Sequence, residues 1–146
     1  MFQLNAAART YDVKLFGMPT WIDSETLRLR HFNTLNVHLT QSSFLVNDSS
    51  GLRALFHDNF VEKFKKEPSN HAFLGADLMN YFSYLIYHGY QNQLNFKEAI
   101  LETTFKGMSK NFDFNYVFNE SEEIERIENQ SVFVIRYQDF EIIICR

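Results

Sequence analysis

The chain has 146 residues, of which 45% are hydrophobic and 16% aromatic, and its formal net charge at pH 7 is −4. This length and composition allow one ordinary globular domain with its own core, and they argue against disorder. The acidic balance, with no dense basic run beyond residues 63–66, argues against nucleic acid as a partner. A single cysteine, Cys145, excludes a disulfide within the chain.

The first third of the chain alternates between helical and extended patterns. The expected elements are the end of a helix at 2–10, a strand at 13–16, a loop at 19–21, a helix capped by Asp23 or Ser24, and a strand at 36–40 that continues as extended chain to 46. A turn is expected at 47–51. An amphipathic helix should follow it, with an apolar stripe that begins at Leu52 and ends at Phe64.

Residues 67–89 are predicted to form a strand-to-helix junction. A loop should lead into a short buried strand at 73–75, and the apolar residues from Leu78 to Ile86 recur at helical spacing. Asp77 would then lie near the start of the helix, where the helix dipole favours an acid.

The last third changes from helical to strand periodicity. A polar loop at 91–95 and a short helix at 96–104 precede a strand around Phe112–Tyr116, and the glutamate-rich stretch 120–128 is predicted to be a solvated break. Residues 131–137 and 140–145 should pair as a terminal hairpin around Gln138 and Asp139. The order of elements predicts an α/β fold with an antiparallel addition at its end.

In this order the segments resemble the C-terminal portion of type I periplasmic binding proteins, which include the branched-chain amino-acid binders and receptor ligand-binding domains. The resemblance is carried by VKLFGMPTW at 13–21, the strand at 36–44, the Phe-rich helix, PSNHAFLGAD at 68–77, and the residues 105–108 before a Phe-x-Phe strand. The chain is especially similar to bacterial envelope proteins that couple this fold to a peptidoglycan-binding LysM module. The family usually has Gly-Tyr-Asp where this chain has Gly75-Ala76-Asp77.

The resemblance implies a single α/β unit with parallel strands, flanking helices and a C-terminal antiparallel hairpin. Residues 1–43 would correspond to lobe two, 44–104 to lobe one, and 105–146 to the strands that return between them. The first strands of both lobes are absent. The chain would therefore be a fragment of a longer polypeptide, which we favour, or a piece whose exposed sheet edges are covered in a homodimer.

The resemblance places such a protein in the periplasm or cell envelope, as part of a longer exported chain. The residues 1–17 lack the pattern of a signal peptide, so the chain taken alone is expected in the cytoplasm. No apolar stretch approaches the roughly 18 residues of a membrane span.

The candidate ligand-binding residues are Met18, Thr20, Trp21, Ser42, Ser43 and Asp77. The first three follow a strand at the end where open α/β sheets bind ligands, and the two serines lie at the expected hinge between lobes. Each has a structural alternative. Pro19 and Trp21 can end the strand and cover the core, the serines can belong to an ordinary connection, and Asp77 can stabilise a helix start.

No motif for catalysis is recognisable, because the chain lacks a Gly-x-Ser-x-Gly sequence and a glycine-rich phosphate loop. The five histidines lack the spacing of metal ligands, so we expect no metal, no cofactor and no enzyme activity. The sequence favours a non-enzymatic module that binds a small solute or a peptidoglycan-derived ligand. The alternative is a structural or protein-interaction module whose ligand cleft has decayed.

Overall fold

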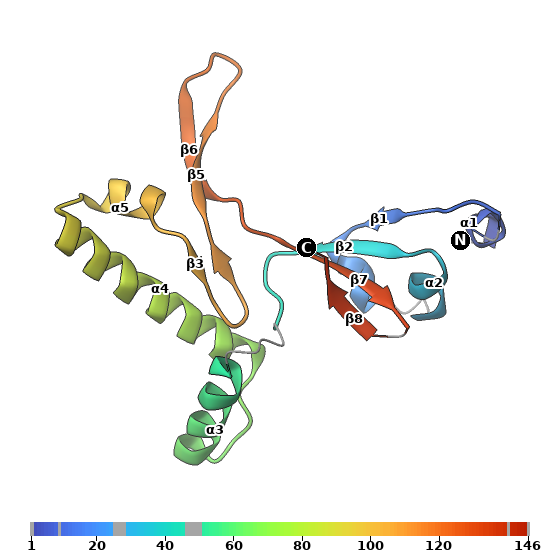
Figure 1. Cartoon of the computed structure of the whole chain (residues 1–146), viewed down its shortest axis with the longest axis horizontal. Helices are drawn as coiled ribbons and strands as arrows, with labels where there is room; N and C mark the ends of the chain where they lie inside the picture. Colours follow the sequence, from blue (N-terminus) through green and yellow to red (C-terminus); the bar gives the residue numbers. More distant parts are fainter. Residues whose placement is uncertain (1, 9, 25–28, 46–50, 140, 146) are drawn as a thin grey trace. The chain divides into compact units, whose positions relative to one another are not determined.

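A computed structural model describes residues 2–8, 10–24, 29–45, 51–139 and 141–145 (Figure 1). The elements in these ranges are α1 (Phe2–Ala7), β1 (Leu15–Gly17), the 3-10 helix η1 (Pro19–Asp23), α2 (Leu29–Thr34), β2 (Val37–Gln41), α3 (Leu52–Phe64), α4 (Asn70–Asn92), α5 (Phe96–Glu102), β3 (Phe105–Lys106), β4 (Asn111–Phe112), β5 (Phe114–Phe118), β6 (Ile124–Asn129), β7 (Phe133–Gln138) and β8 (Glu141–Ile144). The predicted mixture of helices with parallel and antiparallel strands is confirmed.

The chain divides into two compact units, which are described separately. The terminal unit comprises residues 1–42 and 132–146, and the central unit comprises residues 43–131. The expected start of the α2 helix at 25–28 and the expected turn at 47–50 lie outside the described residues.

The terminal unit is built on a four-stranded sheet in the order β1-β2-β7-β8. β1 runs parallel to β2, with Leu15 opposite Val37, whereas β7 is antiparallel to both of its neighbours. Asp139 has a φ of 52° and lies between β7 and β8, in a conformation that a short polar side chain tolerates. The predicted C-terminal antiparallel hairpin is therefore confirmed.

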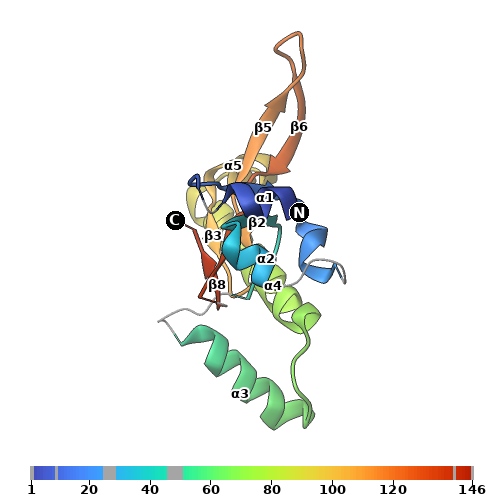
Figure 2. The same ribbon diagram turned by 90° about the vertical axis from the view of Figure 1, so that its right-hand side faces the viewer.

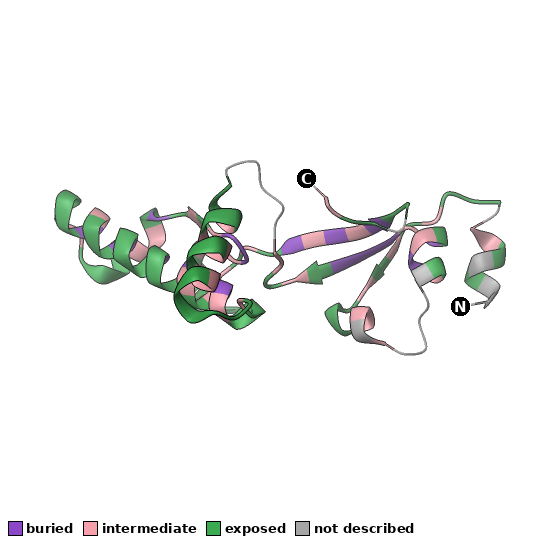
Figure 3. Cartoon of the chain, turned by 90° about the horizontal axis from the view of Figure 1, so that it is seen from below, coloured by how far each residue is buried: buried purple, intermediate pink, exposed green. Residues whose placement is uncertain are grey.

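One face of this sheet packs with α2 to form the core of the terminal unit. Phe133, Ile135 and Tyr137 of β7 are buried and alternate with half-buried neighbours, as expected for a strand with one covered face (Figure 3). The ring of Phe32, from α2, lies 5.0 Å from that of Tyr137. Leu39 of β2 is opposite Ile135 and is also buried, so the core joins both central strands.

The central unit contains the helices α3, α4 and α5. α5 begins with a capping box in which the Asn95 side chain accepts from the Glu98 N–H and the Glu98 carboxylate accepts from the Asn95 N–H. Gly89 of α4 lies close to α5, because a Cβ placed there would be 3.3 Å from that of Ala99. The predicted helices at 52–64 and 96–104 are confirmed, the second ending at Glu102.

The prediction of a strand at 73–75 is wrong, because α4 is one continuous helix from Asn70 to Asn92. Its buried residues are Phe73, Asp77, Tyr81, Leu85 and Gly89, which recur every fourth position. This spacing places them along one side of a helix, and it extends through the segment that was expected to be a strand. The apolar run at 73–74 is thus the start of the helix's buried stripe.

Two small hairpins complete the central unit. In the first, β3 pairs with β4, and Phe105 is opposite Phe112. In the second, β5 pairs with β6, and the end of this hairpin projects beyond α5 in two views (Figure 1 and Figure 2). The prediction of a solvated break at 120–128 is wrong for residues 124–128, which belong to β6.

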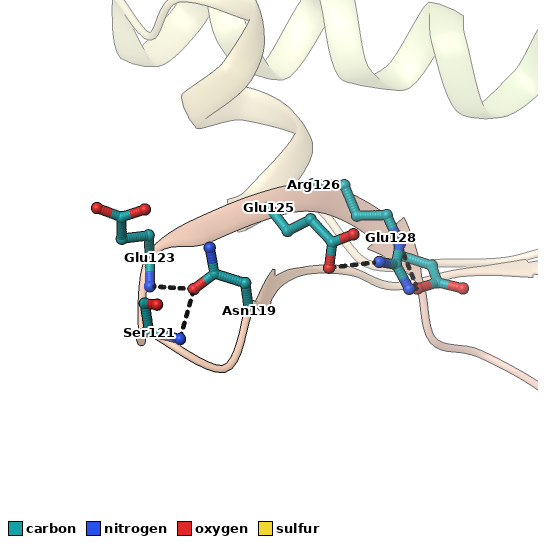
Figure 4. A network of polar contacts seen from close by, with 6 residues as sticks. All are labelled: Asn119, Ser121, Glu123, Glu125, Arg126 and Glu128. Carbon is teal, nitrogen blue, oxygen red and sulfur yellow. Dashed lines mark hydrogen bonds and ion pairs between the residues drawn. The ribbon is translucent and has the colours of Figure 1, made fainter.

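The turn of the second hairpin is held by a single asparagine. The side-chain oxygen of Asn119 accepts from the backbone N–H groups of Ser121 and Glu123, each at 2.9 Å (Figure 4). Such a side chain mimics a backbone turn. The charges beyond it form pairs along β6, where Arg126 contacts Glu125 at 2.9 Å and Glu128 at 3.0 Å. These pairs are exposed, so each adds little stability.

Candidate functional site

Asp77 is the most buried charged residue that the structure describes, with 1% of its surface exposed. Its Oδ1 accepts the backbone N–H of Met108 at 2.8 Å. Its Oδ2 accepts the N–H of Ser109 at 2.7 Å, the Ser109 hydroxyl at 2.7 Å and the N–H of Lys110 at 3.0 Å. A buried carboxylate is stable only when donors replace its water, and here the turn between β3 and β4 supplies them.

The expected place of Asp77 at a helix start is wrong. It lies in the third turn of α4, beyond the reach of the dipole at the helix N-terminus. Gly107 makes the close approach feasible, because a Cβ there would lie 2.5 Å from the Asp77 Cγ and would also meet the carbonyl of Lys110. Asp77 therefore fastens the 107–110 turn onto α4. Both of its oxygens are engaged within the protein.

Next to Asp77 on the same side of α4 is an aromatic core. The ring of Tyr81 stacks on that of Phe112, with centroids 4.4 Å apart and planes 5° apart. Leu85 and Ala99 complete the buried cluster. Burial raises the pKa of the Tyr81 hydroxyl, and this oxygen has no hydrogen-bond partner among the described residues.

The opposite side of α4 exposes large apolar side chains. Met79 is 69% exposed, Phe82 41%, Ile86 67% and Tyr90 81%. At 100° per residue these four lie between about 100° and 180° around the helix from Tyr81, the centre of the buried stripe, with Phe82 at the near end of this range and Tyr90 at the far end. We call these four residues the α4 face. Most of the helix is coloured as exposed in Figure 3.

The α4 face also lacks charge. Asp77 is the only Asp, Glu, Lys or Arg among the 23 residues of α4, and it is buried on the other side. Surface helices of soluble proteins normally place charged residues opposite the buried stripe. The uncharged apolar stripe of α4 departs from this pattern.

A second feature of the central unit is a hollow of about 520 Å³ beside α3. It is lined by Leu45, Gly51, Arg53, Ala54, His57, Asp58, Glu67, Pro68 and Phe73. The Nδ1 of His57 lies 3.0 Å from Asp58 and its Nε2 lies 2.8 Å from Glu67. The hydrogen bonds to Asp58 and then to Glu67 raise the pKa of His57, so the imidazolium is the form that suits both carboxylates.

A second, smaller hollow of about 180 Å³ lies among α3, α4 and the turn after β3, and it is lined in part by Leu55, Phe56, Asp77 and Met108. Pockets for drug-sized ligands measure roughly 300 to 1,000 Å³. This hollow is below that range, whereas the hollow at His57 is within it.

The predicted site residues Met18, Thr20 and Trp21 share one element of the terminal unit. Pro19–Asp23 form η1, and the Trp21 N–H donates to the Met18 carbonyl at 3.0 Å. The Trp21 ring covers Gly17, where an added Cβ would lie 2.6 Å from the ring atom Cζ3. Met18 is 63% exposed and Trp21 is half-buried. Met18, Pro19 and Thr20 are exposed.

Ser42 and Ser43 are exposed and lie at the boundary between the two units, Ser42 in the terminal unit and Ser43 in the central unit. Asp77 belongs to the central unit. Within a unit, the structure brings together Met18, Thr20 and Trp21. Their role in binding a ligand remains a prediction.

Sequence reasoning missed the residues that define the α4 face and the donors to Asp77. The signal for the face was present, since residues 79, 82, 86 and 90 recur at helical spacing within a segment free of exposed charge. The donors left no signal, because Met108 to Lys110 meet Asp77 across more than 30 residues through backbone N–H groups.

Comparison with protein-family models, with curated proteins and with solved structures finds no match for this chain. In the part of the chain that the structure describes, no helix combines the length and apolar character needed to cross a membrane. Within the same residues, no three His, Cys, Asp or Glu side chains are grouped so as to bind a metal ion.

Proposed function

We propose that the chain is a non-enzymatic interaction module that binds another polypeptide through the α4 face. The observation that carries this proposal is the exposure of Met79, Phe82, Ile86 and Tyr90 along one uncharged side of a 23-residue helix. Protein interfaces are enriched in aromatic residues and Met, and their buried centres are depleted of charge.

The exposed area of the α4 face is large enough to support binding. At roughly 200 Å² per large side chain, the exposed fractions of the four residues amount to about 500 Å² of surface. At about 25 cal/mol per Å², covering this area would contribute on the order of 12 kcal/mol before the cost of association is subtracted. The largest exposed apolar patch of a soluble monomer typically measures about 300 to 600 Å², and such a patch is often functional.

The composition of α4 favours a polypeptide over a lipid surface. Helices that lie on membranes carry Lys and Arg on their polar side, where they meet anionic headgroups. α4 has neither residue. A polypeptide with an apolar groove or helix face is therefore the better match.

A photo-crosslinking amino acid tests this proposal in the cells that naturally make the chain. Placed at Phe82, it should form adducts with a polypeptide. Placed at Phe118 in β5, which is 56% exposed, it should form none of the same mass. If position 82 yields no adduct on illumination, the proposal is wrong.

Binding of a small solute is a second proposal, and the hollow beside α3 supports it. Its volume of about 520 Å³ suits a small molecule, and Arg53, His57 and Glu67 line it. The resemblance to type I periplasmic binding proteins points to amino acids or peptidoglycan fragments as ligands and to the cell envelope as the location.

A thermal-shift screen with these two ligand classes tests the second proposal, because a ligand that binds only the folded state raises the melting temperature. His57→Gln should abolish the shift. The matched control is His71→Gln, since His71 is exposed and does not line the hollow. The absence of a shift with either class would count against solute binding.

A further inference from the structure

We infer that the partner of the α4 face is the same face of a second copy of this chain, with the two α4 helices packed antiparallel about a two-fold axis near Phe82. This inference rests on the proposed function and names its partner. It is carried by the spacing of the residues along α4, by the absence of exposed charge and by the area that two such faces would cover.

The spacing of the α4 face is symmetric about the middle of the helix. Gly75 lies on the same side of α4, and the positions 75, 79, 82, 86 and 90 follow one another at intervals of three or four residues. Met79 and Ile86 are equidistant from the peptide between residues 82 and 83, and so are Gly75 and Tyr90. In an antiparallel pair centred there, Met79 meets Ile86 and Gly75 meets Tyr90. Phe82 is opposite Ser83 next to the axis, and the two copies of Phe82 lie beside each other.

The pairing of Gly75 with Tyr90 matches a small residue with a large one. A Cβ added at Gly75 would meet nothing within 4 Å, so open space lies beside this residue. Tyr90 is 81% exposed and can lay its ring there. Intervals of three and four residues are also those that allow long helices to pack side by side at about 20°. The face extends over about 22 Å of helix from Gly75 to Tyr90.

Charge distinguishes a second copy from other partners. In a two-fold interface the same patch occurs on both sides, so any charge near the axis meets an identical charge. The α4 face escapes this repulsion because the only Asp, Glu, Lys or Arg of α4, Asp77, is buried on the opposite side of the helix. It also offers no charge that a charged partner could complement.

The area of two faces reaches the size of a stable interface. Each face exposes about 500 Å², and Tyr87 at its edge, 63% exposed, adds about 130 Å². Two copies would therefore bury on the order of 1,000 to 1,300 Å². Specific interfaces begin at about 1,000 Å², so the helix pair is sufficient without further elements.

Sedimentation velocity of the full chain tests the inference, at about 1 to 200 µM, where interfaces of this size associate. We expect a concentration-dependent dimer. Ile86→Glu should weaken it by more than about 100-fold, because each dimer would bury two unpaired carboxylates. The matched control is Ile124→Glu, since Ile124 is a 51% exposed isoleucine of β6. It should leave the dimer intact. Circular dichroism checks that both variants remain folded.

Disulfide trapping tests the antiparallel register. In a chain with Cys145→Ser, Phe82→Cys should form a disulfide-linked dimer on mild oxidation, whereas Tyr90→Cys should not, since the two copies of residue 90 lie at opposite ends of the pair. Preferential linkage through position 90 would overturn the antiparallel arrangement.

The outcomes separate this inference from the proposed function. A chain that stays monomeric at every concentration, while a crosslinker at Phe82 captures a different protein, would overturn self-pairing and leave the interaction module standing. A monomeric chain with no adduct at Phe82 would overturn both. A dimer that Ile86→Glu does not weaken would show that another surface mediates it, which also overturns the inference.

Discussion

Replacing Asp77 with Ala should destabilise the central unit more than any other single change on the buried side of α4. Asp77 receives four hydrogen bonds from the 107–110 turn, three from backbone N–H groups and one from the Ser109 hydroxyl. Without the carboxylate, the buried N–H groups of Met108 and Ser109 have no acceptor. Each unsatisfied buried donor costs about 1 to 3 kcal/mol.

The expected loss for Asp77→Ala is therefore about 3 to 5 kcal/mol of unfolding free energy, the range seen when one partner of a buried charged network is removed. Asp77→Asn keeps one acceptor oxygen and should lose less, about 2 to 3 kcal/mol. Ser109→Ala removes only the hydroxyl bond and should lose about 1 to 2 kcal/mol. The order of the three variants is a sharper test than any single value.

Urea unfolding measures these losses with an internal control. The only tryptophan, Trp21, lies in the terminal unit, so its fluorescence follows that unit, while far-UV circular dichroism is dominated by α3, α4 and α5 of the central unit. At an m-value of about 1 kcal/mol/M, Asp77→Ala should lower the dichroism midpoint by roughly 3 to 5 M. A loss below about 1 kcal/mol, or Ser109→Ala costing as much as Asp77→Ala, would refute this reasoning.

Three further predictions concern the central unit. Gly107→Ala should cost about 1 to 3 kcal/mol in urea unfolding, because the new Cβ would lie 2.5 Å from the Asp77 Cγ; a neutral effect would contradict the close approach. Tyr81→Phe should be neutral or stabilising by up to about 1 kcal/mol, since it removes a buried hydroxyl that lacks a partner, and a clear loss would point to a bound water. His57 should titrate by NMR above about 6.5, because its ring faces two carboxylates. Its contribution to stability is thus fully present below that pH and is lost as the pH rises through the raised pKa; His57→Gln should remove this dependence.

Much of the fold could be predicted from local pattern. The helices at 52–64 and 96–102 have their own apolar spacing or capping residues, and the terminal hairpin is marked by Gln138 and Asp139 between two apolar strands. These signals act within a few residues, and a single sequence contains them in full. The short segment 73–75 fits either a strand or a helix, and its local pattern does not decide between them, although it belongs to α4.

The candidate site was harder to predict because its meaning depends on what covers each side of α4. An apolar residue such as Ile86 has the same helical spacing whether it packs on a neighbour or faces solvent. Only the positions of α5 and the two hairpins show that Tyr81 and Leu85 are covered and that Ile86 is not. Likewise, residues 124–128 become a strand by pairing with β5, and their glutamates alone predict a solvated loop.

The sequence by itself determined the class of fold, the existence of the helices at 52–64 and 96–102 and the closing hairpin, because spacing and turn residues act locally. The tertiary structure decided the role of Asp77 and the exposure of the α4 face. Asp77 is buried since a turn some 30 residues further along the chain brings three backbone N–H groups to it. Nearly every residue carries a backbone N–H group, so the sequence does not indicate which of these groups bind Asp77, and only the folded chain shows it.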